Sequence, residues 1–192
     1  MRLILWTTAL VLTAVAGTGG AQATAGAADG KPARKFTDRD LIVNALSAAP
    51  ASVSAGATVA THDGQVLRRG STDWVCMPDM PDVPNNTPMC LDAPWRAFID
   101  AWMNKKTPTV TQVGFGYMLQ GDMPVSNTDP FATAPTATNQ WIQDGVPHVM
   151  VLLPDQGLMS SMSTDPKSGG PWVMWKSTPY AHVMIPSAPV RK

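Results

Sequence analysis

The sequence predicts a single α+β domain in which one long amphipathic helix packs on a mainly antiparallel sheet, with long loops between the elements. Three observations support this class. Residues 92–106 carry an apolar stripe at helical spacing. Several short runs elsewhere are rich in valine and aromatic residues and are bounded by glycine and proline. Hydrophobic residues make up 44% of the 192-residue chain, which is enough to bury a core.

The N-terminal segment has the order of an export signal. Arg2 precedes an uncharged apolar stretch over residues 3–16, and small residues follow, ending at Ala21 and Ala23. A retained N-terminal anchor is the alternative, but the stretch is short for a bilayer span, which needs about 20 residues. We therefore expect an exported protein, periplasmic or secreted, without membrane attachment after cleavage. The expected organisation is a signal peptide over 1–23, a flexible tail over 24–36 and one domain over 37–192.

The first elements of the domain are predicted from local signals. Thr37 or Asp38 is suited to cap a short helix that ends before Pro50. Asp63-Gly64 separates two strand-like runs, over 57–61 and 65–69, which predicts a hairpin. Residues 73–77 predict a third strand.

Cys76 and Cys90 are the only cysteines in the chain. An even count in an exported protein favours a disulfide, here across a proline-rich loop. A redox pair or a thiolate metal site is the alternative. The spacing is much wider than C-x-x-C, and no other cysteine is present to complete such a site.

The helix over 92–106 has Asp92 as a plausible N-cap. Its stripe consists of Trp95, Phe98, Ile99, Trp102 and Met103. Because the tryptophans belong to this stripe, a core role is favoured over a ligand cage. A strand follows over 112–120, where Gly114 and Gly116 share one face. Interior glycines mark a bulge or a close approach, by a bulky side chain, another backbone or a ligand.

Residues 121–140 form a long loop of the kind that is often functional. Its polar cluster provides the candidate ligand-binding residues Ser126, Asn127 and Asp129. Such residues also form local turns with their own backbone, and this alternative is favoured. Beyond the loop, three strands are predicted over 146–153, 171–176 and 180–185, with one helical turn over 155–162.

A repeated His-Val-Met tripeptide suggests a metal site. In a strand, residues i and i+2 share a face, so each tripeptide points a histidine and a methionine the same way. If the two strands are neighbours, imidazole and thioether ligands would favour copper, Cu(I) especially. The candidate ligands are His148, Met150, His182 and Met184. Ordinary core packing by methionine is the favoured alternative.

The charge balance and the absence of known catalytic motifs argue against several classes of function. Lys and Arg total 14, and the acidic residues, all aspartates, also total 14, which argues against nucleic acid and anionic membranes as partners. The chain has no G-x-S-x-G elbow, no S-x-x-K, no phosphate-binding loop and no dinucleotide fingerprint. A catalytic role is therefore not favoured.

Several stretches together resemble an uncharacterised group of exported bacterial proteins. They are W-V-C-M-P-D-M-P (74–81), P-M-C-L-D (88–92), G-Y-M-L-Q-G-D (116–122), S-N-T-D-P-F-A (126–132) and G-G-P-W-V-M-W-K-S-T-P-Y-A-H-V-M-I-P (169–186). The resemblance spans most of the expected mature chain. It implies export and a single domain, and it implies no catalytic residue.

The leading hypothesis is an exported protein that binds a small molecule or a protein partner without catalysis and without a cofactor. The first alternative is a copper-binding protein that uses the His and Met set. The second is a hydrolase built around the 121–140 loop, in which Ser126 and Asp129 would join a histidine.

Overall fold

The computed structural model describes residues 36–80, 83 and 85–187. The expected signal peptide over 1–23 and the expected tail, apart from its last residue, lie outside the described residues. None of the helices in the described segments is long and apolar enough to cross a membrane.

The α+β class is confirmed by the elements that form. The helices are α1 (Asp38–Leu46), α2 (Ala51–Ser54), α3 (Ala93–Met103) and the short 3₁₀ helix η1 (Gln156–Met159). The strands are β1 (Thr58–Ala60), β2 (Val66–Arg68), β3 (Val75–Met77), β4 (Met89–Leu91), β5 (Gly114–Met118), β6 (Val125–Ser126), β7 (Trp141–Ile142), β8 (His148–Leu152), β9 (Trp172–Met174) and β10 (His182–Pro186).

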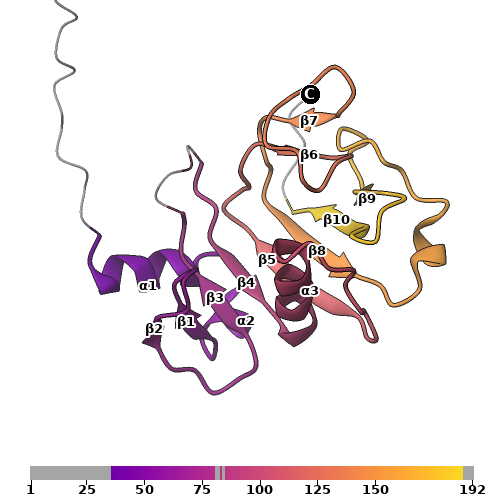
Figure 1. The fold of residues 1–192 in the computed structure, drawn as a ribbon. Helices are drawn as coiled ribbons and strands as arrows, with labels where there is room; N and C mark the ends of the chain where they lie inside the picture. The colour runs from indigo at the N-terminus through magenta and orange to yellow at the C-terminus, as the bar shows by residue number, and fades with distance from the viewer. Residues whose placement is uncertain (1–35, 81–82, 84, 188–192) are drawn as a thin grey trace, which may run out of the picture. The chain divides into compact units, whose positions relative to one another are not determined.

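Eight of these strands form one sheet, in the order β2-β1-β3-β4-β5-β8-β10-β9 (Figure 1). Its neighbours are antiparallel except for β1 and β3, which are parallel. The expected mainly antiparallel sheet is therefore confirmed. The strands β6 and β7 pair separately, inside and just after the predicted 121–140 loop.

In the N-terminal half, the predicted helix cap and the predicted hairpin are both present. Thr37 accepts a hydrogen bond from the backbone of Asp40 and caps α1. At the hairpin between β1 and β2, Gly64 has a φ of 91°, in the left-handed region that favours glycine. The backbone N–H of Thr61 donates to the carbonyl of Gln65 across this turn, at 2.9 Å.

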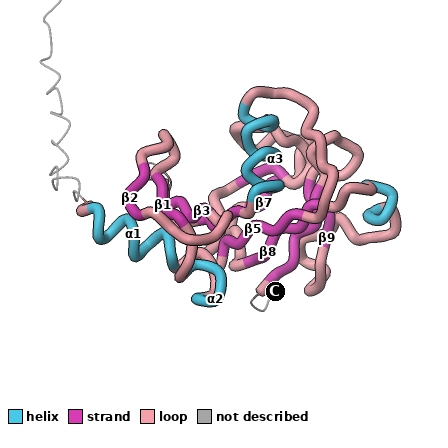
Figure 2. Tube along the Cα trace, turned by 90° about the horizontal axis from the view of Figure 1, so that it is seen from below, coloured by secondary structure: helices cyan, strands magenta, loops and turns pink. Residues whose placement is uncertain are grey.

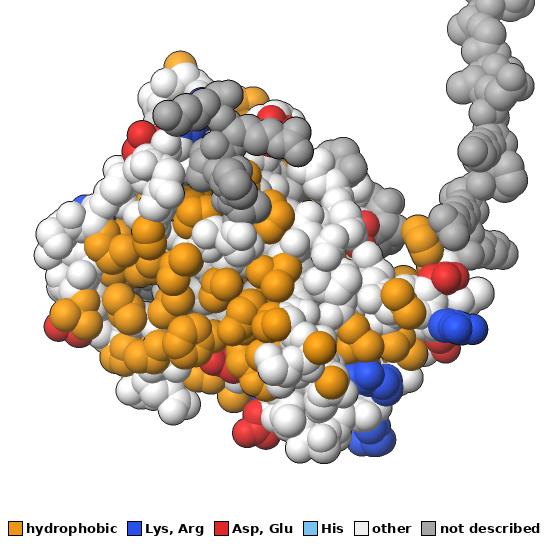
Figure 3. All heavy atoms as spheres, turned by 180° about the vertical axis from the view of Figure 1, so that it is seen from behind, with side chains coloured by type: hydrophobic (Ala, Val, Ile, Leu, Met, Phe, Trp, Pro, Cys, Tyr) orange, Lys and Arg blue, Asp and Glu red, His pale blue; other side chains and the backbone are white. Residues whose placement is uncertain are grey.

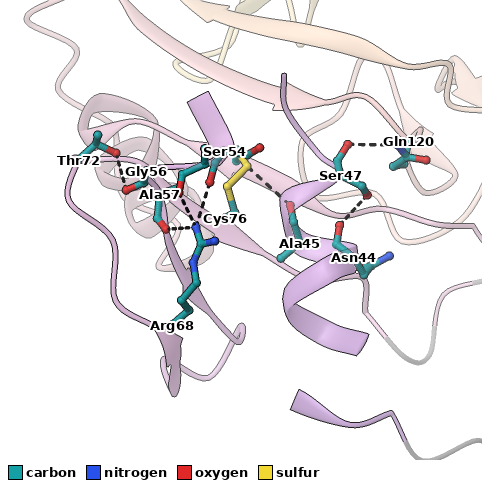
Figure 4. The surroundings of a disulfide bond; sticks show 12 residues. Asn44, Ala45, Ser47, Ser54, Gly56, Ala57, Arg68, Thr72, Cys76 and Gln120 are labelled. Atoms are coloured by element: carbon teal, nitrogen blue, oxygen red, sulfur yellow. Dashed lines mark hydrogen bonds between the residues drawn. A yellow bond between two sulfur atoms is a disulfide. The ribbon is translucent and has the colours of Figure 1, made fainter. Parts of the chain in front are cut away.

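The Cys76–Cys90 disulfide joins directly opposite residues of β3 and β4. Both cysteines are fully buried, in a cluster with Ala45 of α1 and with alanines that follow this helix. Figure 4 shows the disulfide close to Ala45, whose carbonyl oxygen lies 3.7 Å from Cys90 Sγ. This is a van der Waals contact, because a disulfide sulfur has no proton to donate. The structural interpretation of the two cysteines is confirmed.

The helices lie on opposite sides of the sheet (Figure 2). α1 contacts β1 to β4 on one side, and α3 contacts β4 and β5 on the other. The strand β4 shows the alternation that this requires: Cys90 packs in the α1 cluster, and Leu91 packs in the α3 cluster. The sheet therefore has two cores, one on each side.

The helix α3 begins where expected and ends earlier than expected. Asp92 Oδ1 accepts from the backbone of Trp95 at 2.9 Å, and its Oδ2 accepts from the backbone of Phe115 on β5. The predicted end at residue 106 is wrong, because the helix stops at Met103 and Lys105 takes a positive φ of 54°. Met103 is 71% exposed, so its place in the buried stripe was also wrong.

The glycines of β5 face α3 and allow its close approach. A Cβ at Gly114 would lie 2.8 Å from Cβ of Pro94, and a Cβ at Gly116 would lie 2.8 Å from Cε of Met150. Distances this short are essentially never seen for a real Cβ. The expected close approach is therefore made by side chains of the protein itself, including those of α3.

Candidate functional site

The two His-Val-Met strands are neighbours, as the copper hypothesis requires. β8 and β10 pair with Met150 directly opposite Met184. His148 lies opposite Pro186. His182 lies two residues beyond the methionine pair in the other direction, so the Cα atoms of the two histidines are separated by about 13 Å along the strands. The structure thus brings the methionines together and sets the histidines apart.

His182 is enclosed by aromatic rings. Trp95, Phe98 and Trp175 meet it edge to face, with centroid distances of 5.2, 5.9 and 5.1 Å. Its Nδ1 lies 2.9 Å from the carbonyl oxygen of Tyr180. Burial lowers the pKa of His182 to about 4, because the surrounding apolar groups disfavour the charged imidazolium. These contacts are those of a core residue that stays neutral.

His148 has a different environment. Its Nδ1 lies 2.7 Å from the carbonyl oxygen of Val146. Its Nε2 is buried and has no hydrogen-bond partner among the described residues. The nearest carboxylate oxygen, Asp122 Oδ2, lies 4.0 Å from Nε2, which is beyond hydrogen-bond distance. Burial raises the pKa of Asp122, and the nearby His148 partly opposes this.

The candidate ligand-binding residues Ser126 and Asn127 are buried and bonded within the protein. Ser126 Oγ accepts from the backbone of Asp129 at 2.9 Å. The Asn127 amide donates to Gln140 Oε1 and to the carbonyl of residue 164, and its Oδ1 accepts from Trp172 Nε1 at 3.1 Å. Asn127 thus ties β6 to β9 and to the loop between η1 and β9.

Asp129 is the candidate in this cluster that reaches the surface. Its Oδ1 accepts from the backbone of Phe131 in a local turn, and the residue lines a polar hollow of about 570 Å³. In the part of the chain that the structure describes, no hydrogen bond joins Ser126 or Asp129 to a histidine. The hydrolase hypothesis therefore gains no support from the geometry.

A further candidate site is the side of β5, β8 and β10 that faces away from α3. The strand registers place Tyr117, Val149 and Ile185 in one row across the three strands. The next row consists of Phe115, Val151 and Val183. We call these six residues the apolar face. Figure 3 shows this side of the molecule, with apolar side chains gathered over the C-terminal half of the sheet.

Sequence reasoning missed the apolar face as a site. The alternation of Phe115 and Tyr117 with glycines was visible, and it shows that β5 has one bulky face and one small face. Nothing in that pattern says which face the helix covers. The face with Phe115 and Tyr117 can be identified as the uncovered one only from the structure, in which α3 packs on the glycine face.

The chain matches no protein-family model, no curated protein and no solved structure. The resemblance to a group of exported bacterial proteins therefore stays a prediction. The candidate sites rest on their geometry and chemistry alone.

Proposed function

We propose that this chain is a non-enzymatic binding protein whose apolar face receives an amphipathic helix of a protein partner. The observation that carries the proposal is the exposure of large apolar side chains on this part of the sheet. Phe115 is 42% exposed and Ile185 is 37% exposed, whereas Val151 and Val183 between them are buried. Apolar side chains gathered on one side of a protein, as Figure 3 shows them here, typically mark an interaction site.

The layer arrangement supports a helix as the occupant. α1 covers the same side of the sheet over β1 to β4. Toward β9, Met159 of η1 already packs with Val151 and Val183 of this face, in a cluster with Val173. A sheet face is stable when another layer covers it. A partner helix laid on the apolar face would extend the layer that α1 begins, and its apolar stripe would meet six side chains that carry no charge.

The energy available is modest and fits a reversible complex. Fully burying a Phe or Ile side chain contributes about 1.5–3 kcal/mol. Covering the part of Phe115 and of Ile185 that remains exposed therefore contributes roughly 1 kcal/mol each. The half-buried Tyr117 and Val149 add further contact area between them.

The test uses 1-anilinonaphthalene-8-sulfonate, a fluorescent dye that binds exposed apolar surface, as the probe. We expect folded wild-type protein to bind it saturably, and Phe115→Lys and Ile185→Lys to bind it much more weakly. Met103→Lys is the matched control, because Met103 is equally apolar and more exposed but lies on α3. Phe115 and Ile185 are partly buried, so each of their substitutions should cost roughly 1–2 kcal/mol, which a urea melt of each variant measures beside the dye binding.

Two outcomes would contradict the proposal. One is equal dye binding by all four proteins. The other is a concentration-dependent dimer in analytical ultracentrifugation that Phe115→Lys dissociates, since the face would then be occupied by a second copy of the chain rather than by a different partner.

We also infer that the protein acts outside the cytoplasm, in the periplasm or as a secreted protein. The disulfide is consistent with an oxidising compartment. The export signal predicted over 1–23 supports the same location, and the assay of signal cleavage described in the Discussion tests it.

A further inference from the structure

We propose a second site, a buried binding site for a soft monovalent metal ion, Cu(I), formed by His148 Nε2 and the thioether of Met118, with Met89 as the next thioether along the same row. This site is independent of the apolar face and lies on the opposite side of the sheet. It differs from the ligand set predicted from the sequence, of which it keeps only His148.

The first observation is the state of the His148 ring. The residue is 1% exposed, and its Nδ1 is held by the carbonyl oxygen of Val146 at 2.7 Å. A carbonyl accepts only, so in the neutral imidazole Nδ1 carries the proton and Nε2 presents a lone pair. Metal-binding histidines are held in this way, with the other ring N–H donated to a backbone carbonyl or a carboxylate. The lone pair on Nε2 is buried without a partner among the described residues, and such atoms are uncommon in folded proteins.

The second observation is the row of methionines beside that ring. Met118 on β5 lies directly opposite His148 on β8. β4 and β5 pair with Cys90 opposite Tyr117, so the next position along places Met89 opposite Met118. Opposite residues on neighbouring antiparallel strands have Cβ atoms about 5 Å apart on one face of the sheet. Met118 is buried, so its sulfur is shielded from water as well.

The donor types decide which metal fits. In the described segments, no group of three or more His, Cys, Asp or Glu residues could hold a metal ion. The donors in the His148 row are thioethers, and Asp122 is the carboxylate nearest to His148 Nε2, at 4.0 Å. Thioether and imidazole ligands favour Cu(I) over Mg²⁺ or Ca²⁺, which prefer oxygen.

Asp122 is the acidic residue that would balance the charge of a buried cation beside His148. Its Oδ2 lies 4.0 Å from His148 Nε2, and its Oδ1 accepts from the backbone of Met123 at 2.7 Å. An ionised carboxylate at this position would offset the positive charge of Cu(I). The site would then be close to neutral, which lowers the cost of burying the ion.

The other residues of the predicted set lie outside the row that contains His148 and Met118. The methyl group of Met150 sits where a side chain on Gly116 would be, 2.8 Å from the position of its Cβ. Met184, opposite Met150, packs in the α3 cluster with Trp172. His182 is enclosed by aromatic rings, two strand positions beyond the methionine pair.

The test is an anaerobic titration of the full exported chain with Cu(I), in competition with the chelator bathocuproine disulfonate. We expect one Cu(I) per wild-type chain, no stoichiometric binding by His148→Gln, and at least about tenfold weaker binding by Met118→Leu, as expected when a metal ligand is removed. Met184→Leu is the matched control, because it makes the same change in the same core at a side chain two strand positions from the His148 row, and its affinity should equal that of the wild type. Met-to-Leu changes nearly conserve volume, so both variants should fold.

The described chain has no free cysteine, so a thiolate does not compete for the metal. Equal affinities for wild type and Met118→Leu, or no stoichiometric binding by the wild type, would overturn the proposal. Equal weakening by Met184→Leu and Met118→Leu would also overturn it, in favour of the set predicted from the sequence.

A second measurement holds even if His148→Gln does not fold. The redox-inert probe Ag(I), added to wild-type protein labelled with ¹⁵N at histidine, should shift the Nε2 resonance of His148 and leave those of His182 unmoved. An unmoved His148 resonance would mean that this nitrogen is satisfied by water or by Asp122, and would refute the site.

Discussion

Protonation of His182 should destabilise the fold as the pH falls. The imidazole is 2% exposed and lies among three aromatic rings, so water would not hydrate a positive charge on it. Its pKa is about 4 in the folded protein, against an ordinary value of 6.5. The folded state therefore keeps His182 neutral over a range of pH in which the unfolded chain takes up a proton.

The sign and size of the effect follow from linkage between protonation and folding. Between pH 6.5 and about 4 the unfolded state holds one more proton at this residue, so the free energy of unfolding falls with falling pH. One pKa unit corresponds to about 1.4 kcal/mol. The total loss is therefore about 3 kcal/mol. The stabilising contribution is complete above pH 6.5 and is lost below it.

Asp122 titrates in the opposite sense. Burial raises the pKa of this carboxyl above 3.8, so its stabilising contribution is present below that pH and is lost as the pH rises through the folded-state value. The effect of His182 must therefore be measured as a difference between two proteins that both keep Asp122.

The assay is urea denaturation of wild type and His182→Gln at several pH values from 7.5 to 4, a range that begins above the unfolded-state pKa and ends at the folded-state pKa. We expect wild type to lose about 3 kcal/mol more than the variant across this range. His62→Gln is the control for loss of a histidine elsewhere, at an exposed residue whose Nε2 lies 2.8 Å from the carbonyl oxygen of Pro78. Parallel pH profiles for wild type and His182→Gln would refute the reasoning, as would an NMR titration midpoint near 6.5 for the His182 ring.

Four further predictions concern stability and export. Replacing both Cys76 and Cys90 with alanine should lower the free energy of unfolding by about 3 kcal/mol, because it reopens a loop with a sequence separation of 14 residues; an unchanged urea midpoint would contradict this. Gly114→Ala should cost about 1–3 kcal/mol, since the new Cβ would lie 2.8 Å from a rigid proline ring in the first turn of α3, and thermal denaturation measures it. Asn127→Ala should cost about 1–3 kcal/mol by leaving a buried indole N–H without an acceptor, and a melting temperature equal to the wild type would show that the loop does not need this link. N-terminal sequencing of protein from the exported fraction should begin near Thr24, and a chain that retains its first residue would exclude signal cleavage.

Local features of this fold could be predicted from the sequence. Helix caps, the hairpin turn and the start of α3 depend on residues within four positions of one another, as at Thr37, Asp63-Gly64 and Asp92. The disulfide could be predicted because Cys76 and Cys90 have no other cysteine to pair with. The end of α3 was less predictable, because Met103 and the residues after it are exposed and tertiary contacts do not extend the helix to residue 106.

Only the tertiary structure decided which faces and which neighbours these elements have. The alternation in β5 defines two faces, but the choice between them depends on α3, whose close packing requires Gly114 and Gly116 beneath it and leaves Phe115 exposed. The His-Val-Met tripeptide occurs in both β8 and β10, but this repeat does not determine the register in which the two strands pair. That register pairs Met150 with Met184 and places His148 beside Met118 of another strand. Register depends on contacts between residues distant in sequence, so the pattern of a single strand does not contain it.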